Sequence, residues 1–121
     1  MIIQKAKTFK EKVPLHKRKK LVEMIQIHHP TKIPVILESK TIELELSRVL
    51  VPDNITIASF LKKIRNHLRP DGSMSDQTAC YLITDNNILL SPSDEISIIY
   101  SRHREKCGFL FLHIEKENLY G

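Results

Sequence analysis

The stretch that decides the fold lies late in the chain and reads Phe109-Leu110-Phe111-Leu112-His113-Ile114. Its side chains are apolar with one exception, and they lack the alternation of a strand that has one face in water. Near-continuous apolar strands are typical of parallel pairing inside a sheet that is covered on both faces. The stretch therefore predicts a central strand that runs parallel to another strand of the same kind.

Residues 32–38 provide that partner, because Ile33, Val35, Ile36 and Leu37 form a short, mostly β-branched apolar run. Pro34 lies inside the run and predicts an edge position or a local bulge, since proline has no N–H to donate. Residues 42–51 follow as a half-exposed strand of alternating apolar and polar residues, which ends at Pro52. Residues 79–83 predict a third strand, with a turn at 85–87.

The clearest helix spans residues 56–68, where apolar side chains recur with helical spacing at Ile57, Phe60, Leu61, Ile64 and Leu68. Two further helices are predicted before the first strand, over residues 4–12 and from Pro14 to about Ile27. Residues 69–78 read as a polar loop. A short helix is expected to begin at Ser91-Pro92, an N-cap followed by proline, and to bury Ile96, Ile99 and Tyr100.

The resulting order, helix-helix-β-β-α-β-α-β, predicts an α+β protein. A hairpin, a crossover helix and a final central strand describe a β-grasp, or ubiquitin-like, fold with a four-stranded mixed sheet and two additional N-terminal helices. We assign residues 1–28 to an N-terminal helical extension and residues 29–121 to the ubiquitin-like domain with its C-terminal glycine tail. A chain of 121 residues has room for one core, so both parts are expected to form a single compact domain.

Composition narrows the class of protein further. No apolar run approaches the roughly 20 residues of a membrane span, and no signal-peptide pattern opens the chain. Cys80 and Cys107 lack C-x-x-C spacing, which indicates free thiols in a reducing cytosol. Adjacent side chains on a helix diverge by about 100°, so His28 and His29 do not predict a metal site. Cys107 has no legible histidine–acid partner. We therefore expect no metal, no cofactor and no catalytic residues.

The net charge of +5 is unevenly distributed along the chain. Residues 1–32 hold nine of the nineteen lysines and arginines and two of the fourteen acidic residues. This basic region is a candidate binding surface for acidic peptides, anionic lipid or nucleic acid. Residues 17–20, Lys-Arg-Lys-Lys, fit a nucleic-acid patch or a solvated helix face, and the lack of interleaved aromatic residues favours the solvated face.

Several segments together resemble the autophagy ubiquitin-like modifiers, of the GABA-receptor-associated-protein and microtubule-associated light-chain type. The segments are Phe9-Lys10-Glu11-Lys12, residues 30–38 with the sequence PTKIPVILE, Leu50-Val51-Pro52 before a helix, Gly108-Phe109-Leu110, and the final Tyr120-Gly121. The resemblance extends from Phe9 to Gly121, and the H-P-x-K-I-P-V-I segment and the L-V-P step are its most specific parts.

The resemblance implies that the protein is a substrate of enzymes rather than an enzyme. In this family the carboxylate of the terminal glycine, here Gly121, passes through activating and conjugating enzymes to an amide with phosphatidylethanolamine. A cysteine protease removes residues that follow the glycine and also releases the lipid. Nothing follows Gly121 in this sequence, which fits a chain that needs no trimming and equally a chain already cut to its mature form. The implied location is the cytoplasm, and the autophagosome membrane after lipidation.

The resemblance also implies a site for receptor and adaptor peptides with an aromatic-x-x-aliphatic core, which add a strand beside the second strand. Matching positions assign a first pocket, for the aromatic side chain, to Leu21, Ile25, Pro34, Ile36, Arg48, Leu50 and Phe109. They assign a second pocket, for the aliphatic side chain, to Val49, Val51, Pro52, Phe60, Ile64 and His67. Acidic residues that flank the peptide core are expected to contact Lys10, Lys12, Lys32 and Arg48.

Four positions depart from the family pattern, and they bear on the choice of partner more than on the fold. Leu21 stands where an acidic residue is common, Leu46 where a lysine is common, and Val49 and Cys80 where phenylalanine is common. Two rival functions stay open at this point. One is a non-covalent ubiquitin-like docking domain with an unused glycine, and the other is a basic nucleic-acid-binding module, although the family resemblance implies no nucleic-acid partner.

Overall fold

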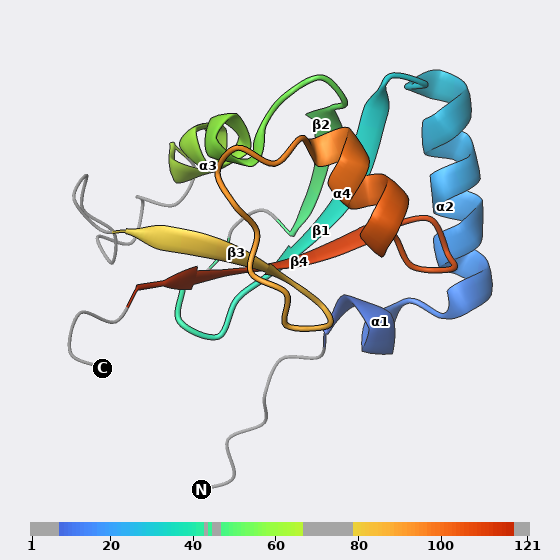
Figure 1. Cartoon of the computed structure of the whole chain (residues 1–121). Helices are drawn as coiled ribbons and strands as arrows, with labels where there is room; N and C mark the ends of the chain where they lie inside the picture. Colours follow the sequence, from blue (N-terminus) through green and yellow to red (C-terminus); the bar gives the residue numbers. More distant parts are fainter. Residues whose placement is uncertain (1–7, 43, 45–46, 67–78, 118–121) are drawn as a thin grey trace, which may run out of the picture.

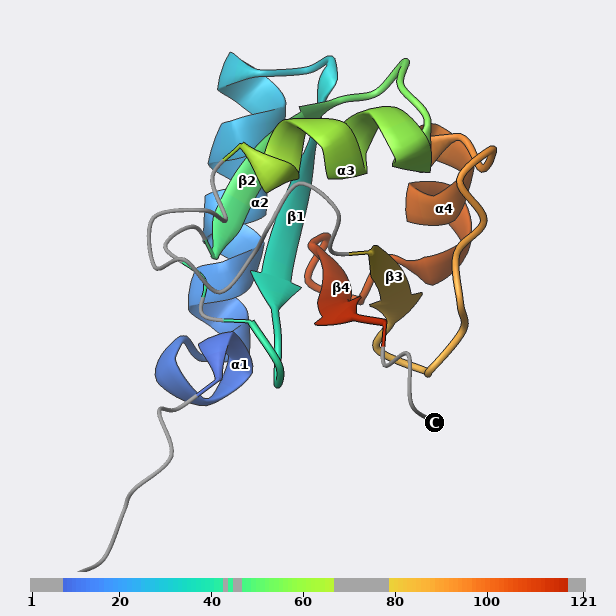
Figure 2. The same ribbon diagram turned by 90° about the vertical axis from the view of Figure 1, so that its left-hand side faces the viewer.

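One four-stranded sheet organises the molecule, and helices cover both of its faces (Figures 1 and 2). The computed structural model describes residues 8–42, 44, 47–66 and 79–117. Its elements are α1 (Phe9–Lys12), α2 (Leu15–His28), β1 (Lys32–Glu38), β2 (Arg48–Pro52), α3 (Ile57–Arg65), β3 (Cys80–Thr84), α4 (Ile96–His103) and β4 (Leu110–Lys116). This order confirms the predicted α+β arrangement.

The strand order across the sheet is β2-β1-β4-β3. Strands β1 and β4 are parallel, with Val35 opposite Leu110, whereas β1–β2 and β3–β4 are antiparallel. The prediction that the last strand runs parallel to the first at the centre of the sheet is therefore confirmed. A hairpin, a helix and a central final strand in this arrangement form a β-grasp fold.

Alternating side chains give the sheet two different faces. Val35 of β1 and Leu110 of β4 point to the face covered by α3 and α4, where Ile57, Phe60 and Ile96 complete a large buried cluster. Ile36, Phe109 and Phe111 point to the opposite face, where Val22 of α2 covers them and Phe9 of α1 packs against them. We refer to these as the α3–α4 face and the α1–α2 face.

Pro34 marks neither the edge strand nor the bulge predicted from sequence, because β1 lies between β2 and β4 and pairs with β2 residue for residue from Lys32 to Ile36. The amide of Leu37 donates to the carbonyl of Ser47 on the β2 side, at 2.8 Å. Amides alternate along a strand, so the missing N–H of Pro34 falls on the β4 side. Pairing with β4 begins only at Val35, and the proline therefore costs the ladder no hydrogen bond.

Strand β2 begins at Arg48, whereas the alternating pattern predicted a start near Ile42. Residues 39–42 instead form a turn that is held by the carboxylate of Glu115. This carboxylate accepts hydrogen bonds from the amides of Lys40 and Thr41, at 2.8 and 3.0 Å, and from the Thr41 hydroxyl at 2.6 Å. Ile42 is buried from this turn rather than from a strand, and Leu46 lies outside the described residues.

Two predicted helix boundaries also shift. Helix α4 begins at Ile96, not at Ser91-Pro92, because the Ser91 amide donates to the Asp94 carboxylate at 2.8 Å and closes a separate turn. Within the predicted 4–12 segment, the described helix is Phe9–Lys12. Helix α3 begins as expected, after Thr56, whose hydroxyl accepts from the Ser59 amide at 3.2 Å. The predicted last residues of that helix, 67–68, and the 69–78 loop lie outside the described residues.

Candidate functional site

A pocket of about 290 Å³ lies between helix α2 and the β1–β2 hairpin. Its walls combine apolar side chains from two helical turns, both hairpin strands and the start of β4 with one cation. The lining residues are Leu21, Ile25, Val35, Arg48, Val49, Leu50 and Phe109. Such a mixture of apolar walls and a single charged group suits an apolar side chain on a ligand that also carries negative charge.

Gly108 allows the close approach of α2 and β4 that forms one wall of this pocket. Its φ is +98°, and a Cβ built there would lie 2.5 Å from Cγ1 of the buried Val22. The Tyr100 hydroxyl fixes the same bend by donating to the Gly108 carbonyl at 2.7 Å. Burial raises the pKa of Tyr100 above its ordinary value, so this hydroxyl keeps its proton. Phe109 is thereby held against α2.

The structure brings five of the seven predicted first-pocket residues together, namely Leu21, Ile25, Arg48, Leu50 and Phe109. The other two, Pro34 and Ile36, are buried and do not line the pocket. Val49 takes part instead, although it was assigned to the second pocket, and so does Val35, whose side chain is buried on the α3–α4 face. These two valines are cross-strand partners. Knowledge of the pairing register between β1 and β2 would therefore have placed them side by side.

Strand β2 forms one edge of the sheet, beside the pocket. Leu50, at the middle of this strand, is 38% exposed, whereas its neighbour Val51 points into the α3–α4 core. An edge strand offers unpaired backbone donors and acceptors to another chain. The pocket and the edge can therefore be engaged together by one extended peptide.

Three of the six residues predicted for the second pocket are buried in the structure. Val51, Phe60 and Ile64 are only 1%, 2% and 6% exposed and belong to the α3–α4 core. Val49 and Pro52 are half-buried, and His67 lies outside the described residues.

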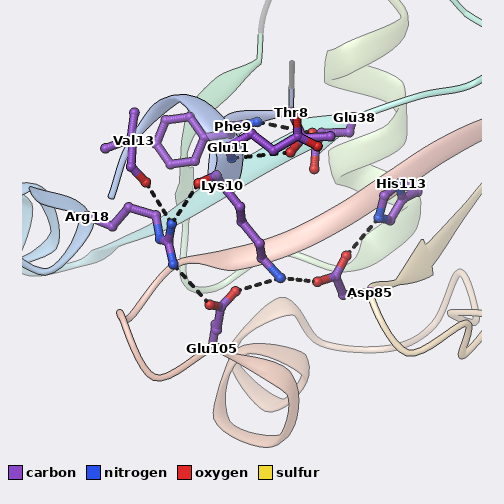
Figure 3. A network of polar contacts seen from close by, with 10 residues as sticks. All are labelled: Thr8, Phe9, Lys10, Glu11, Val13, Arg18, Glu38, Asp85, Glu105 and His113. Carbon is purple, nitrogen blue, oxygen red and sulfur yellow. Dashed lines mark hydrogen bonds and ion pairs between the residues drawn. The ribbon is translucent and has the colours of Figure 1, made fainter. Parts of the chain in front are cut away.

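Three of the four cations predicted to meet acidic residues, Lys12, Lys32 and Arg48, are exposed. Lys10 is engaged elsewhere, as Figure 3 shows. Its ammonium group pairs with the carboxylates of Asp85 and Glu105, the latter at 2.9 Å, and lies 4.5 Å from the centre of the Phe111 ring. An acidic peptide would have to compete with these internal partners for Lys10.

The same network ties α1 to the ubiquitin-like core (Figure 3). Arg18 donates to the carbonyls of Val13 and Lys10, at 2.7 and 3.2 Å, and lies 3.5 Å from the Glu105 carboxylate. His113 of β4 lies 2.9 Å from the other carboxylate oxygen of Asp85. Side chains of α1, α2 and β4 thus meet around the carboxylates of Asp85 and Glu105.

Sequence reasoning missed this network because Arg18 was read as part of a solvated Lys-Arg-Lys-Lys run. Arg18 is in fact buried, while Lys17, Lys19 and Lys20 are exposed. The available signal was helical spacing: Arg18 shares an i, i+4, i+7 stripe with Val22 and Ile25 and therefore points inward.

Charges shift the pKa values of two members of the network. Burial alone would lower the pKa of Lys10, but hydrogen bonds and charges from Asp85 and Glu105 outweigh it and raise the pKa. Burial would likewise raise the pKa of Asp85, but His113 and Lys10 outweigh it and lower the pKa. Both groups are therefore charged in the folded protein near neutral pH.

Gly121, the predicted conjugation site, lies outside the described residues. The last described residue, Glu117, donates its amide to the Ala79 carbonyl at 2.9 Å. Within the described ranges, the histidine, cysteine and acidic side chains form no group of three or more that could hold a metal ion. Cys80 and Cys107 are not joined by a disulfide bond. Among the described helices, none combines the length and apolarity needed to cross a membrane.

Comparison with known proteins identifies the class of this β-grasp fold. The family described as "Autophagy protein Atg8 ubiquitin like" matches residues 17–121. Autophagy-related protein 8 of Dictyostelium discoideum is 34% identical over 118 residues, covering 94% of this chain and 93% of that protein. Protein lgg-2 of Caenorhabditis elegans is 32% identical over 119 residues, covering 94% of this chain and 88% of that one.

The crystal structure of Trypanosoma brucei ATG8 has the same fold, with a TM-score of 0.83 at 24% identity. The alignment covers 97% of this chain and all of that chain. Taken with the family match, this places the molecule among ubiquitin-like proteins. The chain belongs to the Atg8 family of ubiquitin-like autophagy proteins.

Proposed function

We propose that the chain is a modifier that is conjugated through Gly121 to phosphatidylethanolamine and that recruits cargo receptors during autophagosome formation. The observation that carries this proposal is the Atg8 family match, which extends through Gly121 and includes the pocket-forming strands. The protein would be a substrate of the conjugation enzymes rather than a catalyst, present in the cytoplasm and, after conjugation, on the autophagosome membrane.

The chemistry is an acyl transfer at the main-chain carboxylate. An activating enzyme forms the adenylate, a cysteine thiolate displaces the nucleotide, and the thioester passes to a conjugating enzyme. The phosphatidylethanolamine amine then attacks the thioester carbonyl, so that an amide forms and the thiol leaves. Glycine suits this step because it has no Cβ to hinder a narrow enzyme channel. The two acyl chains of the lipid supply stable anchoring, at about 0.8 kcal/mol per buried CH₂. A delipidating cysteine protease would hydrolyse the amide.

The pocket would receive the aromatic residue of a receptor or adaptor peptide while the peptide backbone pairs with β2. Burying one large apolar side chain contributes about 1.5–3 kcal/mol. Ordering the peptide offsets part of the gain, and we therefore expect micromolar affinity, near −8 kcal/mol. Arg48 lines the pocket and is exposed, so it is well placed for an acidic residue beside the aromatic one.

The aliphatic residue of the peptide would require a local opening of the molecule. Val51 and Phe60 are buried between β2 and α3, so their separation would be part of binding. Peptides that fill the first pocket alone should bind without this opening, and more weakly than complete ones.

Conjugation is tested by reconstitution with the activating and conjugating enzymes and phosphatidylethanolamine vesicles. We expect intact protein to gain the mass of the lipid and Gly121→Ala or a chain lacking Gly121 to gain none. Asn118→Ala keeps the terminal glycine and serves as the matched control. Normal lipidation of the Gly121 variants would refute the proposed chemistry.

A second candidate function, a docking domain that acts without conjugation, is favoured by one observation. The described lining of the pocket comes from α2, β1, β2 and the residue before β4, so these parts of the fold can take up a peptide without the conjugated end. This alternative predicts peptide binding by calorimetry together with a complete lack of thioester on the conjugating enzyme. Detection of the thioester on a non-reducing gel would exclude it.

A further inference from the structure

The outer surface of α2 carries basic and apolar side chains that the peptide pocket does not use. Met24 is 57% exposed and Ile27 is 74% exposed, the highest value among the described large apolar residues. Lys17 and Lys20 are exposed on the same helix. We name these four residues the outer patch.

Helical geometry gathers the outer patch on one side of α2. Each residue of an α-helix advances by about 100°, so the four side chains fall within a sector of about 80°. Ile27 points about 140° away from the buried Val22 and about 160° away from Ile25 of the pocket. The patch is therefore a separate surface that faces away from the sheet.

This arrangement differs from an ordinary solvated helix. A helix on the surface of a globular protein normally places its apolar residues on one stripe and polar residues opposite. Helix α2 places apolar residues on both sides, and Met24 and Ile27 are neighbours at i, i+3 spacing rather than isolated. Lysines extend the same side of the helix toward its N-terminus, and Glu23 is its one acidic residue.

We propose that the outer patch docks on an anionic membrane surface. Apolar tips next to lysines match the boundary of a bilayer, where aliphatic groups enter the acyl region and ammonium groups remain at the lipid phosphates. The surrounding sequence adds to the attraction, since residues 1–32 carry nine lysines and arginines against two acidic residues. The charge of the patch thus identifies the partner as anionic, and its aliphatic side chains identify that partner as lipid.

Nucleic acid fits the same charge but not the same side chains. Proteins that bind single strands without sequence preference stack the bases on aromatic side chains. The outer patch has no aromatic residue, and exposed methionine and isoleucine side chains offer nothing to a phosphate backbone. RNA binding is for this reason an outcome that the experiment must exclude.

Helix α2, which carries the outer patch, lies on the far side of the molecule from the end of strand β4 (Figures 1 and 2). Docking through α2 consequently does not depend on the lipid attachment proposed for Gly121. The proposal can be tested on the full, unconjugated chain, and its result is independent of the conjugation experiment.

Sedimentation with vesicles measures the docking directly. The probe is phosphatidylcholine containing about 30% phosphatidylserine, an anionic surface that attracts lysines. We expect binding to these vesicles and none to pure phosphatidylcholine. Lys17→Gln with Lys20→Gln should lower the partition coefficient about five-fold per lysine. Met24→Ser with Ile27→Ser should also lower it several-fold, while Lys62→Gln with Lys63→Gln on α3 and Leu89→Ser serve as controls without effect.

A fluorescence measurement reports insertion at one position. The chain has no tryptophan, so Ile27→Trp introduces a single probe at the most exposed apolar position of the patch. Its emission should shift to shorter wavelength on anionic vesicles and be quenched by brominated acyl chains. Leu89→Trp, at another exposed apolar position, should do neither.

Three results would overturn the proposal. They are equal binding to neutral and anionic vesicles, unchanged binding after Met24→Ser with Ile27→Ser, and an emission of Ile27→Trp that does not move. Tighter binding to single-stranded RNA than to vesicles, unaffected by the loss of Met24 and Ile27, would also overturn it. Because the four positions are exposed, melting curves of all variants should coincide with that of the parent chain.

Discussion

The two faces of the sheet are covered to different degrees. On the α3–α4 face fifteen buried residues form one continuous cluster, and α3 and α4 each contribute to it. On the α1–α2 face the buried cluster has five residues, and Leu21 and Ile25 are only partly covered. A pocket is left on this second face, beside an edge strand. One face thus holds most of the buried apolar side chains, and the other keeps a pocket open to a ligand.

The sharpest test of this division is Phe60→Ala on the closed face. Phe60 is 2% exposed in the larger cluster, and deleting a buried phenylalanine side chain usually costs about 3–5 kcal/mol. Urea unfolding should show a loss of this size. Lys62→Ala, an exposed change on the same helix, should alter the free energy of unfolding by less than about 0.5 kcal/mol. Similar stabilities for the two variants would break the comparison.

Gly108→Ala tests the bend before β4, where Gly108 lies against Val22 of α2 and accepts a hydrogen bond from Tyr100 of α4. The positive φ and the overlap with Val22 should each destabilise the variant, together by about 2–4 kcal/mol. Peptide affinity should fall as well, because Phe109 would move relative to α2. Serine at the neighbouring exposed Lys106 is the control. A melting temperature unchanged by Gly108→Ala would show that the bend is less constrained than its geometry indicates.

Leu50→Asp tests the open face. Leu50 lines the pocket yet is 38% exposed, so the charge should weaken an aromatic-x-x-aliphatic peptide about 10- to 100-fold while barely affecting stability. Calorimetry gives the affinity and a melting curve gives the stability. Leu89→Asp, another exposed leucine, should change neither. Loss of folding in Leu50→Asp would mean that this face is also structural.

The Lys10 network should have the smallest effect, because Lys10 and Asp85 are each more than one-third exposed. Lys10→Gln is expected to cost less than about 1 kcal/mol at neutral pH. Asp85 has a lowered pKa in the folded state, so its contribution is present above its ordinary value of 3.8 and is lost as pH falls through the folded value. Urea unfolding of both proteins should therefore converge in acid. A difference that grows below about pH 3 would contradict this sign.

At the alkaline end the opposite group controls the pair. The pKa of Lys10 is raised in the folded state, so its contribution is present below the ordinary value of 10.5 and is lost as pH rises through the folded value. Between these limits the stability difference between Lys10→Gln and the parent should be flat.

The centre of the fold was legible in the sequence because its strands are unbroken apolar runs. The stretches that contain β1 and β4 are short, continuous apolar runs rich in β-branched or aromatic residues, which favours buried strands, and the apolar stripe of α3 recurs with helical spacing. The predicted starts of β2 and α4 were wrong, because side-chain hydrogen bonds hold turns just before these elements. Glu115 holds the turn at residues 39–42, which includes Ile42, the first residue of the predicted alternating strand, and Asp94 holds Ser91 in a separate turn before α4.

The pocket was legible only in part. Leu21, Ile25 and Leu50 were placed there by family resemblance, whereas Val35 and Val49 follow from strand register, which the sequence alone did not fix. The engagement of Lys10 could not be anticipated, since its partners Asp85 and Glu105 come from distant loops. Burial of Phe60 was ambiguous as well, because a core residue and a pocket wall have the same composition.

The central pairing of β1 with β4 has a consequence for the time course of folding. Val35 and Leu110 are distant in sequence, and closing so long a loop costs entropy before any contact rewards it. The β1–β2 hairpin is local and should form early, leaving the inner side of β1 without a neighbour until β4 arrives. During that interval the chain exposes an apolar strand edge, which makes slow renaturation at high concentration its most vulnerable moment.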